Sequence, residues 1–159
     1  GFFELNSMIL GMGAFYGGLV QIFAGLNESK KGNTFAATAF TSYGAFWLSF
    51  VTLLLLPELG LAKATSTTAL GFYLLMWGIF TGAMFIGTLK LTRALQVVFG
   101  SLTILFLLLS IKDFTGIVLV GRFAGAVGVF CGFSAIYTAI AEIMNDIYKK
   151  TVMPLGYMK

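Results

Sequence analysis

Histidine is absent from the 159-residue chain, and cysteine occurs once, as Cys131. Without histidine the chain cannot build a catalytic triad that uses histidine as its base, nor a zinc site made of histidine and cysteine ligands. Cys131 lies inside an apolar run, where a single cysteine usually serves as a small packing residue. The sequence also places no convincing nucleophile beside a base. We therefore expect no metal and no cofactor, and predict that the chain is not an enzyme.

Proline and charge are scarce as well. The two prolines, Pro57 and Pro154, stand between or after the apolar runs, so we expect no helix to be interrupted by proline. Charged residues make up 10% of the chain and hydrophobic residues 58%, with a mean hydropathy of +0.95. An ordinary soluble domain contains about 25% charged residues. The composition therefore predicts an all-α integral membrane protein that lies in the lipid bilayer.

Several apolar runs are long enough to cross a bilayer, which takes about 20 residues. We expect five spans, at residues 5–26, 33–56, 68–89, 94–111 and 116–148, in a single transmembrane domain covering residues 1–159. The basic residues divide unequally between the two sides of such a protein. Seven lie on one side (Lys30, Lys31, Lys90, Arg93, Lys149, Lys150 and Lys159) and three on the other (Lys63, Lys112 and Arg122).

Because lysine and arginine are enriched in cytoplasmic loops, this asymmetry predicts a cytoplasmic C-terminus. Five spans then place Gly1 outside the cell without an export signal. A sixth, N-terminal span missing from this sequence would return the N-terminus to the cytoplasm. The asymmetry also accounts for the net charge of +4, so nucleic-acid binding is not suggested. Four basic residues expected on the cytoplasmic side could gather anions at a pore mouth, but membrane topology explains them equally well. They are Lys30, Lys31, Lys90 and Arg93.

Small residues form stripes along several spans, which would let helix backbones approach closely. The first span carries Asn6, Gly13, Gly17, Gln21 and Ala24 on one face, the third Gly71, Gly78 and Gly82, and the fifth Gly121, Gly125, Gly128, Gly132, Ala135 and Ala139. The second span separates small hydroxyls, among them Thr34, Thr38, Thr41, Ser42, Ser49 and Thr52, from an aromatic face that includes Tyr43 and Trp47.

Polar groups inside the spans are candidates for a solute path. They are Asn6, Gln21, Thr41, Ser42, Ser101, Thr103 and Ser134. Bonds to a neighbouring helix, or from each hydroxyl to its own backbone, are the competing explanation. Glu142 could relay protons. The alternative places Glu142 and Asp146 among lipid headgroups, with Asp146 pairing to Lys150 four residues later.

Three runs of the sequence resemble the acetate uptake transporter family, the succinate–acetate permeases of prokaryotes and their fungal relatives. They are GMGAFYGGLVQIFAGLNESKKGNTFAATAFTSYGAFW from Gly11, GTLKLTRALQVVFGSLT from Gly87 and CGFSAIYTAIAEIMN from Cys131. The resemblance implies a six-helix subunit in the cytoplasmic membrane that assembles as a hexamer. Such a subunit moves acetate, and in some members succinate, with a proton as a symporter or as an anion channel. The family's Asn-Pro-Ala-Pro-Leu-Gly-Leu segment before the first helix is absent here.

The same resemblance assigns roles to particular residues. Tyr43 and Leu102 would form a hydrophobic constriction together with a phenylalanine on the missing helix, and Ala135 matches a position associated with substrate choice. An apolar constriction favours a weakly hydrated solute, so we expect a carboxylate to pass best when a proton neutralises it. The competing hypothesis is a structural or regulatory membrane subunit that transports nothing. An intramembrane enzyme is a weaker third possibility.

Overall fold

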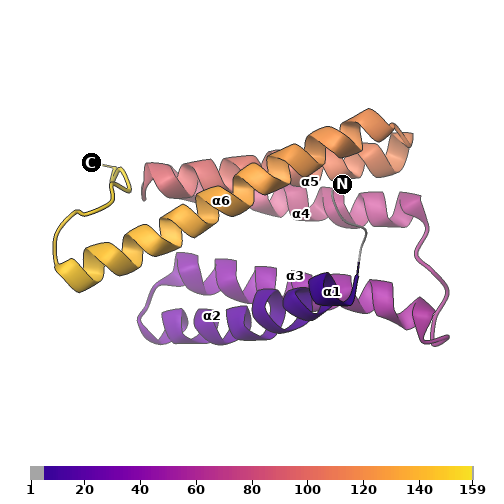
Figure 1. Cartoon of the computed structure of the whole chain (residues 1–159), viewed down its shortest axis with the longest axis horizontal. Helices are drawn as coiled ribbons and strands as arrows, with labels where there is room; N and C mark the ends of the chain where they lie inside the picture. The colour runs from indigo at the N-terminus through magenta and orange to yellow at the C-terminus, as the bar shows by residue number, and fades with distance from the viewer. Residues whose placement is uncertain (1–5, 159) are drawn as a thin grey trace. The chain divides into compact units, whose positions relative to one another are not determined.

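The computed structural model describes residues 6–158, which form helices and connecting turns (Figure 1). In chain order these are α1 (Ser7–Met12), the π-helical segment η1 (Gly13–Val20), α2 (Gln21–Lys30), α3 (Thr34–Glu58), α4 (Thr67–Thr88), α5 (Arg93–Thr115) and α6 (Val118–Tyr148). Since α1, η1 and α2 run on without a break, the described residues contain five apolar helical spans, each long enough to cross a membrane. The prediction of an all-α membrane protein with five spans is confirmed. Gly1, Leu5 and Lys159 lie outside the described residues.

The chain divides into two compact units, Gly1–Thr65 and Ser66–Lys159. In the first unit, α2 and α3 lie side by side in Figure 1, joined by a short turn at residues 31–33. Gly32 takes φ +74°, and the Asn33 side chain caps α3 by accepting the N–H of Ala36. The Glu28 carboxylate accepts a 2.6 Å bond from Lys31, which raises the pKa of that lysine above its ordinary value. These bonds fix a tight turn between two antiparallel helices.

Glycines set the distance between these two helices. A methyl group added at Gly25 would lie 2.6 Å from Cγ2 of Thr41, and one at Gly44 would lie 2.8 Å from the carbonyl oxygen of Gly18. Contacts this short leave no room for a side chain, so the backbones touch directly.

The small stripe expected on the first span is confirmed only in part by the structure. The buried residues of α1, η1 and α2 are Gly13, Gly18 and Gly25, whereas Gly17, Gln21 and Ala24 are only half-buried. The reason is the π-helical segment, whose i→i+5 bonding adds a residue to the turn and shifts every later residue relative to an α-helical face. Gly13 and Gly17 of the predicted face both pack against Trp47, so the α-helical wheel holds for them but misses Gly18 and Gly25.

Proline interrupts no described helix, but Pro57 does not lie between the spans as expected. Pro57 lies in the last turn of α3, which ends one residue later at Glu58. Proline has no N–H, so the helix loses only the bond that residue 57 would donate to the Leu53 carbonyl, and it ends directly afterwards. Two other boundaries lie beyond the predicted ones, since the first span continues to Lys30 and α5 continues to Thr115.

In the second unit, α5 packs against both α4 and α6. The turn between α5 and α6 is short because Gly116 adopts φ +70°, a conformation that ends α5 and reverses the chain. The small stripe of α4 packs against α5 as predicted. A methyl group at Gly71 would lie 2.6 Å from the Phe114 ring, and one at Gly78 would lie 3.2 Å from Leu107.

The stripe on α6 packs only in part within this chain. Gly128 faces Leu105, but a methyl group at Gly125 or Gly132 would meet no other described group within 4 Å. The buried residues of α6 lie on a neighbouring face and are Ala124, Cys131, Thr138 and Ala141. Cys131 is thus a buried packing residue, as expected.

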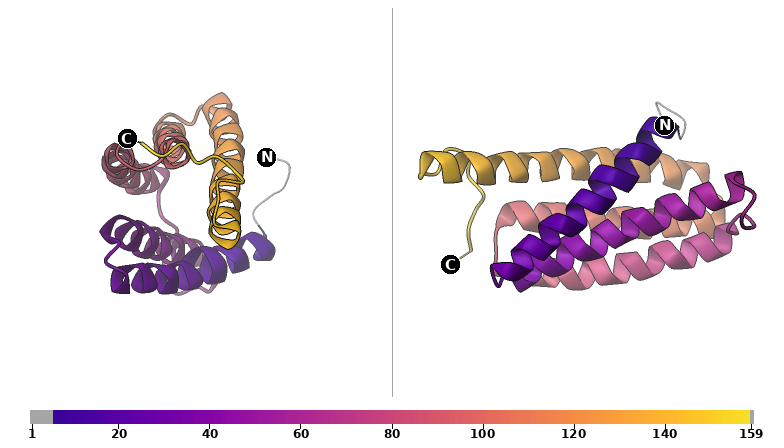
Figure 2. Two further views of the ribbon diagram at one scale, coloured as in Figure 1. Left: turned by 90° about the vertical axis from the view of Figure 1, so that its left-hand side faces the viewer. Right: turned by 90° about the horizontal axis from the view of Figure 1, so that it is seen from below.

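After α6 the chain returns toward the start of α5 (Figure 2). The Asn145 side chain accepts the N–H groups of Val152 and Met153 and donates to the Met153 carbonyl. Tyr137 donates its hydroxyl to the Pro154 carbonyl at 2.9 Å. The next carbonyls, of Leu155 and Gly156, accept the first N–H groups of α5. This C-terminal segment, residues 152–158, therefore ties α6 to the beginning of α5.

Candidate functional site

Tyr43 lies near the middle of α3, in the first unit, and is buried with 7% of its surface exposed. Its neighbour Gly44 packs on Ile22 of α2, so the backbone that carries the tyrosine is held closely. Leu102 lies on α5, in the second unit, and is half-buried. Each of the two proposed constriction residues is thus placed on a firmly packed helix.

The predicted path hydroxyls bond mainly to their own helices. Thr41 donates to the Ala37 carbonyl at 2.7 Å, Ser101 to Val97 at 2.7 Å, Thr103 to Phe99 at 2.8 Å and Ser134 to Cys131 at 2.7 Å. This pattern matches the competing explanation given for hydroxyls in membrane helices. Its chemical consequence is that each of these hydroxyls directs its proton to a backbone carbonyl and offers neighbouring groups an oxygen acceptor.

The remaining uncharged candidates have different surroundings. Asn6 caps α1, because its side-chain oxygen accepts the N–H groups of Met8 and Ile9. Gln21 is half-buried at the start of α2, directly after the π-helical segment, and Ser42 is half-buried on α3. Asn6 therefore has a structural role in starting the helix.

On α6, Ala135 and Glu142 are exposed in this chain. The ion pair expected between Asp146 and Lys150 is replaced by one between Asp146 and Lys149, at 2.8 Å. The reason is that Lys149 takes φ +52° and ends the helix, so Lys150 lies beyond the last turn and no longer stands one helical turn from Asp146. Both charged groups are well exposed, and the pair contributes little to stability.

A groove of about 560 Å³ opens in the second unit between the first turns of α5, the middle of α6 and the C-terminal segment. Ser134 is the one predicted path residue among its lining side chains. Arg93 is the charged residue of the lining, and the other walls are mostly apolar. The groove thus combines one cation with a hydrophobic wall.

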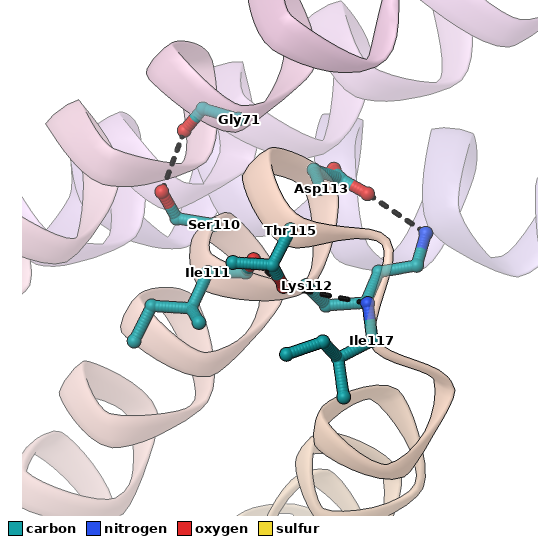
Figure 3. A network of polar contacts seen from close by, with 7 residues as sticks. All are labelled: Gly71, Ser110, Ile111, Lys112, Asp113, Thr115 and Ile117. Atoms are coloured by element: carbon teal, nitrogen blue, oxygen red, sulfur yellow. Dashed lines mark hydrogen bonds and ion pairs between the residues drawn. The ribbon is translucent and has the colours of Figure 1, made fainter.

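A polar group that was not among the predicted site residues lies at the other end of α5 (Figure 3). Ser110 donates to the Gly71 carbonyl on α4 at 2.9 Å, and Lys112 pairs with Asp113 at 2.7 Å. The Asp113 side chain is only 4% exposed. The sequence does show Asp113 as an acidic residue just after an apolar run. Because the predicted span ended at residue 111, Asp113 was expected in a loop. The extra helical turn to Thr115 instead turns Asp113 inward.

Five apolar helices, some of them packed through close glycine contacts, define a multi-pass helical membrane protein. Its sequence matches the model of the GPR1/FUN34/yaaH family over residues 3–158, and the chain belongs to that family. The family resemblance drawn from the sequence is confirmed.

Relatives of established name agree with this assignment. The chain is 56% identical over 156 residues to the succinate-acetate/proton symporter SatP of Escherichia coli K12, covering 98% of this chain and 83% of the symporter. It is 33% identical over 171 residues to acetate permease A of Emericella nidulans, covering 95% of this chain and 56% of the permease.

A solved structure described as the bacterial acetate channel SatP matches with a TM-score of 0.97 and 56% identity, covering 98% of this chain and 86% of that one. These relatives are transporters and channels, which supports the prediction that the chain is not an enzyme.

Proposed function

We propose that the chain transports acetate, and also succinate, across the cell membrane. The observation that carries the proposal is the match to an acetate channel at 56% identity and a TM-score of 0.97 over 98% of the chain. A symporter of succinate and acetate is equally similar in sequence. The charge asymmetry of the loops favours a cytoplasmic C-terminus.

Tyr43 and Leu102 are the proposed constriction. Both are bulky groups on packed helices, and the burial of Tyr43 agrees with a place in the protein interior. Such a constriction opposes a hydrated anion more strongly than a neutral acid, since it offers few groups to replace water. Ala135 is the proposed selectivity position, where a larger side chain would narrow the range of acids.

The acid crosses in its protonated form in this proposal. A carboxylate needs hydrogen-bond donors, yet the hydroxyls of Thr41, Ser101, Thr103 and Ser134 already donate to backbone carbonyls. What they offer is acceptor oxygens, which suit the O–H group of a neutral carboxylic acid. The proton then travels with the solute, so uptake rises as the external pH falls. Glu142 is the candidate residue for relaying protons to the cytoplasmic side.

Uptake of labelled acetate into liposomes containing the protein tests the proposal, with and without an inward proton gradient. We expect protein-dependent uptake above the leak of protein-free vesicles. The Tyr43→Ala and Leu102→Ala variants should admit larger acids, whereas Tyr43→Phe, which keeps the ring, should retain the original selectivity. Accumulation above the external concentration, faster than in protein-free vesicles, shows that a proton crosses with acetate. Uptake that only equilibrates despite the gradient indicates passage of the anion alone.

The absence of protein-dependent flux in both conditions would instead support a structural or regulatory subunit. Unchanged selectivity in both alanine variants would remove Tyr43 and Leu102 from the path. The Glu142→Gln variant should slow proton-driven uptake if Glu142 relays protons, and leave it unchanged if the residue only contacts headgroups.

The active form in this proposal is a homo-oligomer, a hexamer as the family resemblance implies. The incompletely packed small-residue face of α6, which includes Gly125 and Gly132, agrees with further helix contacts outside this chain. The mass of the detergent-solubilised particle, measured by light scattering with the detergent contribution subtracted, distinguishes a hexamer from a monomer.

A further inference from the structure

The groove beside α5 has a polar end and an apolar wall. Arg93 is an exposed residue at the first turn of α5, where the helix enters its apolar stretch. Val97 stands one turn further along α5, and Phe130 and Phe133 line the groove from α6. Their exposed fractions of 44%, 57% and 68% mean that this chain leaves the hydrophobic wall uncovered.

Arg93 is held in place by the C-terminal segment. Its backbone N–H donates to the Gly156 carbonyl at 2.9 Å. Gly156 has φ +69°, and a methyl group there would come within 3.0 to 3.2 Å of three carbons of the Arg93 side chain. The absence of a side chain at Gly156 therefore lets the arginine stem lie flat on the segment. This contact positions the Cβ, Cγ and Cδ atoms of Arg93, from which the guanidinium extends.

The charge in the groove has no counterpart in the described part of the chain. No acidic side chain lines the groove, and the ion pairs of residues 6–158 do not include Arg93. The first N–H groups of α5 are not available to a ligand either, because Gly156, Leu155 and Thr92 accept them. An anion at this end of the groove would therefore bind the guanidinium itself.

We propose that this groove binds an anionic phospholipid of the surrounding bilayer. The guanidinium matches a phosphate group with two parallel hydrogen bonds, and Val97, Phe130 and Phe133 match an acyl chain that descends from it. A volume of about 560 Å³ is far more than a two-carbon acid fills and suits a larger, partly apolar ligand. The groove belongs to the second unit alone, and Ser134 is the one lining residue that it shares with the proposed solute path.

Native mass spectrometry of the detergent-solubilised protein, titrated with phosphatidylglycerol or phosphatidylcholine, tests the proposal. We expect Arg93→Gln to weaken phosphatidylglycerol binding about fivefold, the effect of one basic side chain near an anionic membrane surface. Phosphatidylcholine carries the same phosphate but no net charge, so its binding should be weaker from the start and should fall less. Because the Arg93 side chain is exposed, the substitution leaves the packed core intact. Arg93→Lys keeps the charge and should restore part of the affinity.

Arg122 supplies the matched control, since it is also an exposed arginine but lies near the other end of α6 and outside the groove lining. Arg122→Gln should bind phosphatidylglycerol like the parent protein. Val97→Trp, which fills the groove while keeping Arg93, should weaken phosphatidylglycerol binding without lowering the mass of the assembly.

Two results would overturn the proposal. One is equal phosphatidylglycerol binding by the parent protein, Arg93→Gln and Arg122→Gln, or an equal loss in both variants, which indicates nonspecific charge. The other is a Val97→Trp protein that dissociates into smaller particles while its lipid affinity is unchanged. That result assigns the groove to a second copy of the chain.

Discussion

Ser110 shows what a single polar residue does in this protein. Unlike the path hydroxyls, it donates to the backbone of another helix, at the Gly71 carbonyl, and it is 1% exposed. The bond fixes α5 against α4 at the point where the Phe114 ring covers Gly71. Because Ser110 is buried, water cannot replace the bond in the folded state. Losing it therefore lowers the free energy of unfolding without compensation from solvent.

We expect Ser110→Ala to lower the free energy of unfolding by about 1 kcal/mol, the usual value of one interhelical hydrogen bond. Reversible unfolding in mixed detergent micelles, followed by circular dichroism, measures the change. Ser134→Ala is the matched control, because that hydroxyl bonds only within its own helix and its loss should have a much smaller effect. Equal losses in the two variants would contradict the role assigned to the cross-helix bond.

At the scale of helices, glycine position decides how closely neighbours pack. Gly44 and Gly11 both belong to the first unit, yet a methyl group at Gly44 would lie 2.8 Å from a backbone oxygen, whereas one at Gly11 would meet nothing within 4 Å. Backbone cannot move aside as the end of a flexible side chain can. Alanine substitutions at the two positions therefore distinguish the effect of helix propensity on stability from the effect of packing.

Gly44→Ala should destabilise the protein by about 1–3 kcal/mol, because the overpacking exceeds the gain in helix propensity. Gly11→Ala should be neutral or stabilising by up to about 1 kcal/mol, since only the propensity changes. Thermal unfolding of the two variants in the same detergent compares them. A Gly44→Ala protein as stable as Gly11→Ala would show that α2 and α3 can separate at no cost.

For the whole molecule, the order of spans determines which loops share a side of the membrane. Thr65 lies between α3 and α4, and Thr151 follows α6, so three spans separate them. We expect Thr65→Cys to react with a membrane-impermeant maleimide in intact cells, and Thr151→Cys to react only after permeabilisation. Cys131→Ala provides the background, since the single natural cysteine is buried. Both positions are uncharged, so neither substitution disturbs the charge asymmetry that sets orientation. Labelling of both from the same side would refute the span count.

Much of the fold could be predicted from composition and run length. The five spans lie within a few residues of the predicted ranges, because a bilayer admits only long apolar helices. The failures were local. In the span that contains the π-helical segment, the buried Gly18 and Gly25 were missed, and Lys149 took over the ion pair expected of Lys150. Neither backbone feature has a periodic signal in the sequence.

The candidate site was predicted more through family resemblance than through residue patterns. Polar residues at span positions suggested a path, but most of the hydroxyls bond to their own helices. Asp113 and the bond from Ser110 to Gly71 were missed because they depend on how a helix end turns and on which neighbour it meets. Contacts between residues far apart in the chain cannot be inferred from the hydropathy of either one.

The sequence by itself determined that this protein is a helical membrane protein of one recognisable family, because hydropathy and helix length leave few alternatives in a bilayer. Only the tertiary structure decided which glycines touch another backbone and which hydroxyls cross between helices. It also decided that the C-terminal segment returns to hold Arg93. These features follow from local helix geometry and from long-range packing, and a uniform helical wheel represents neither.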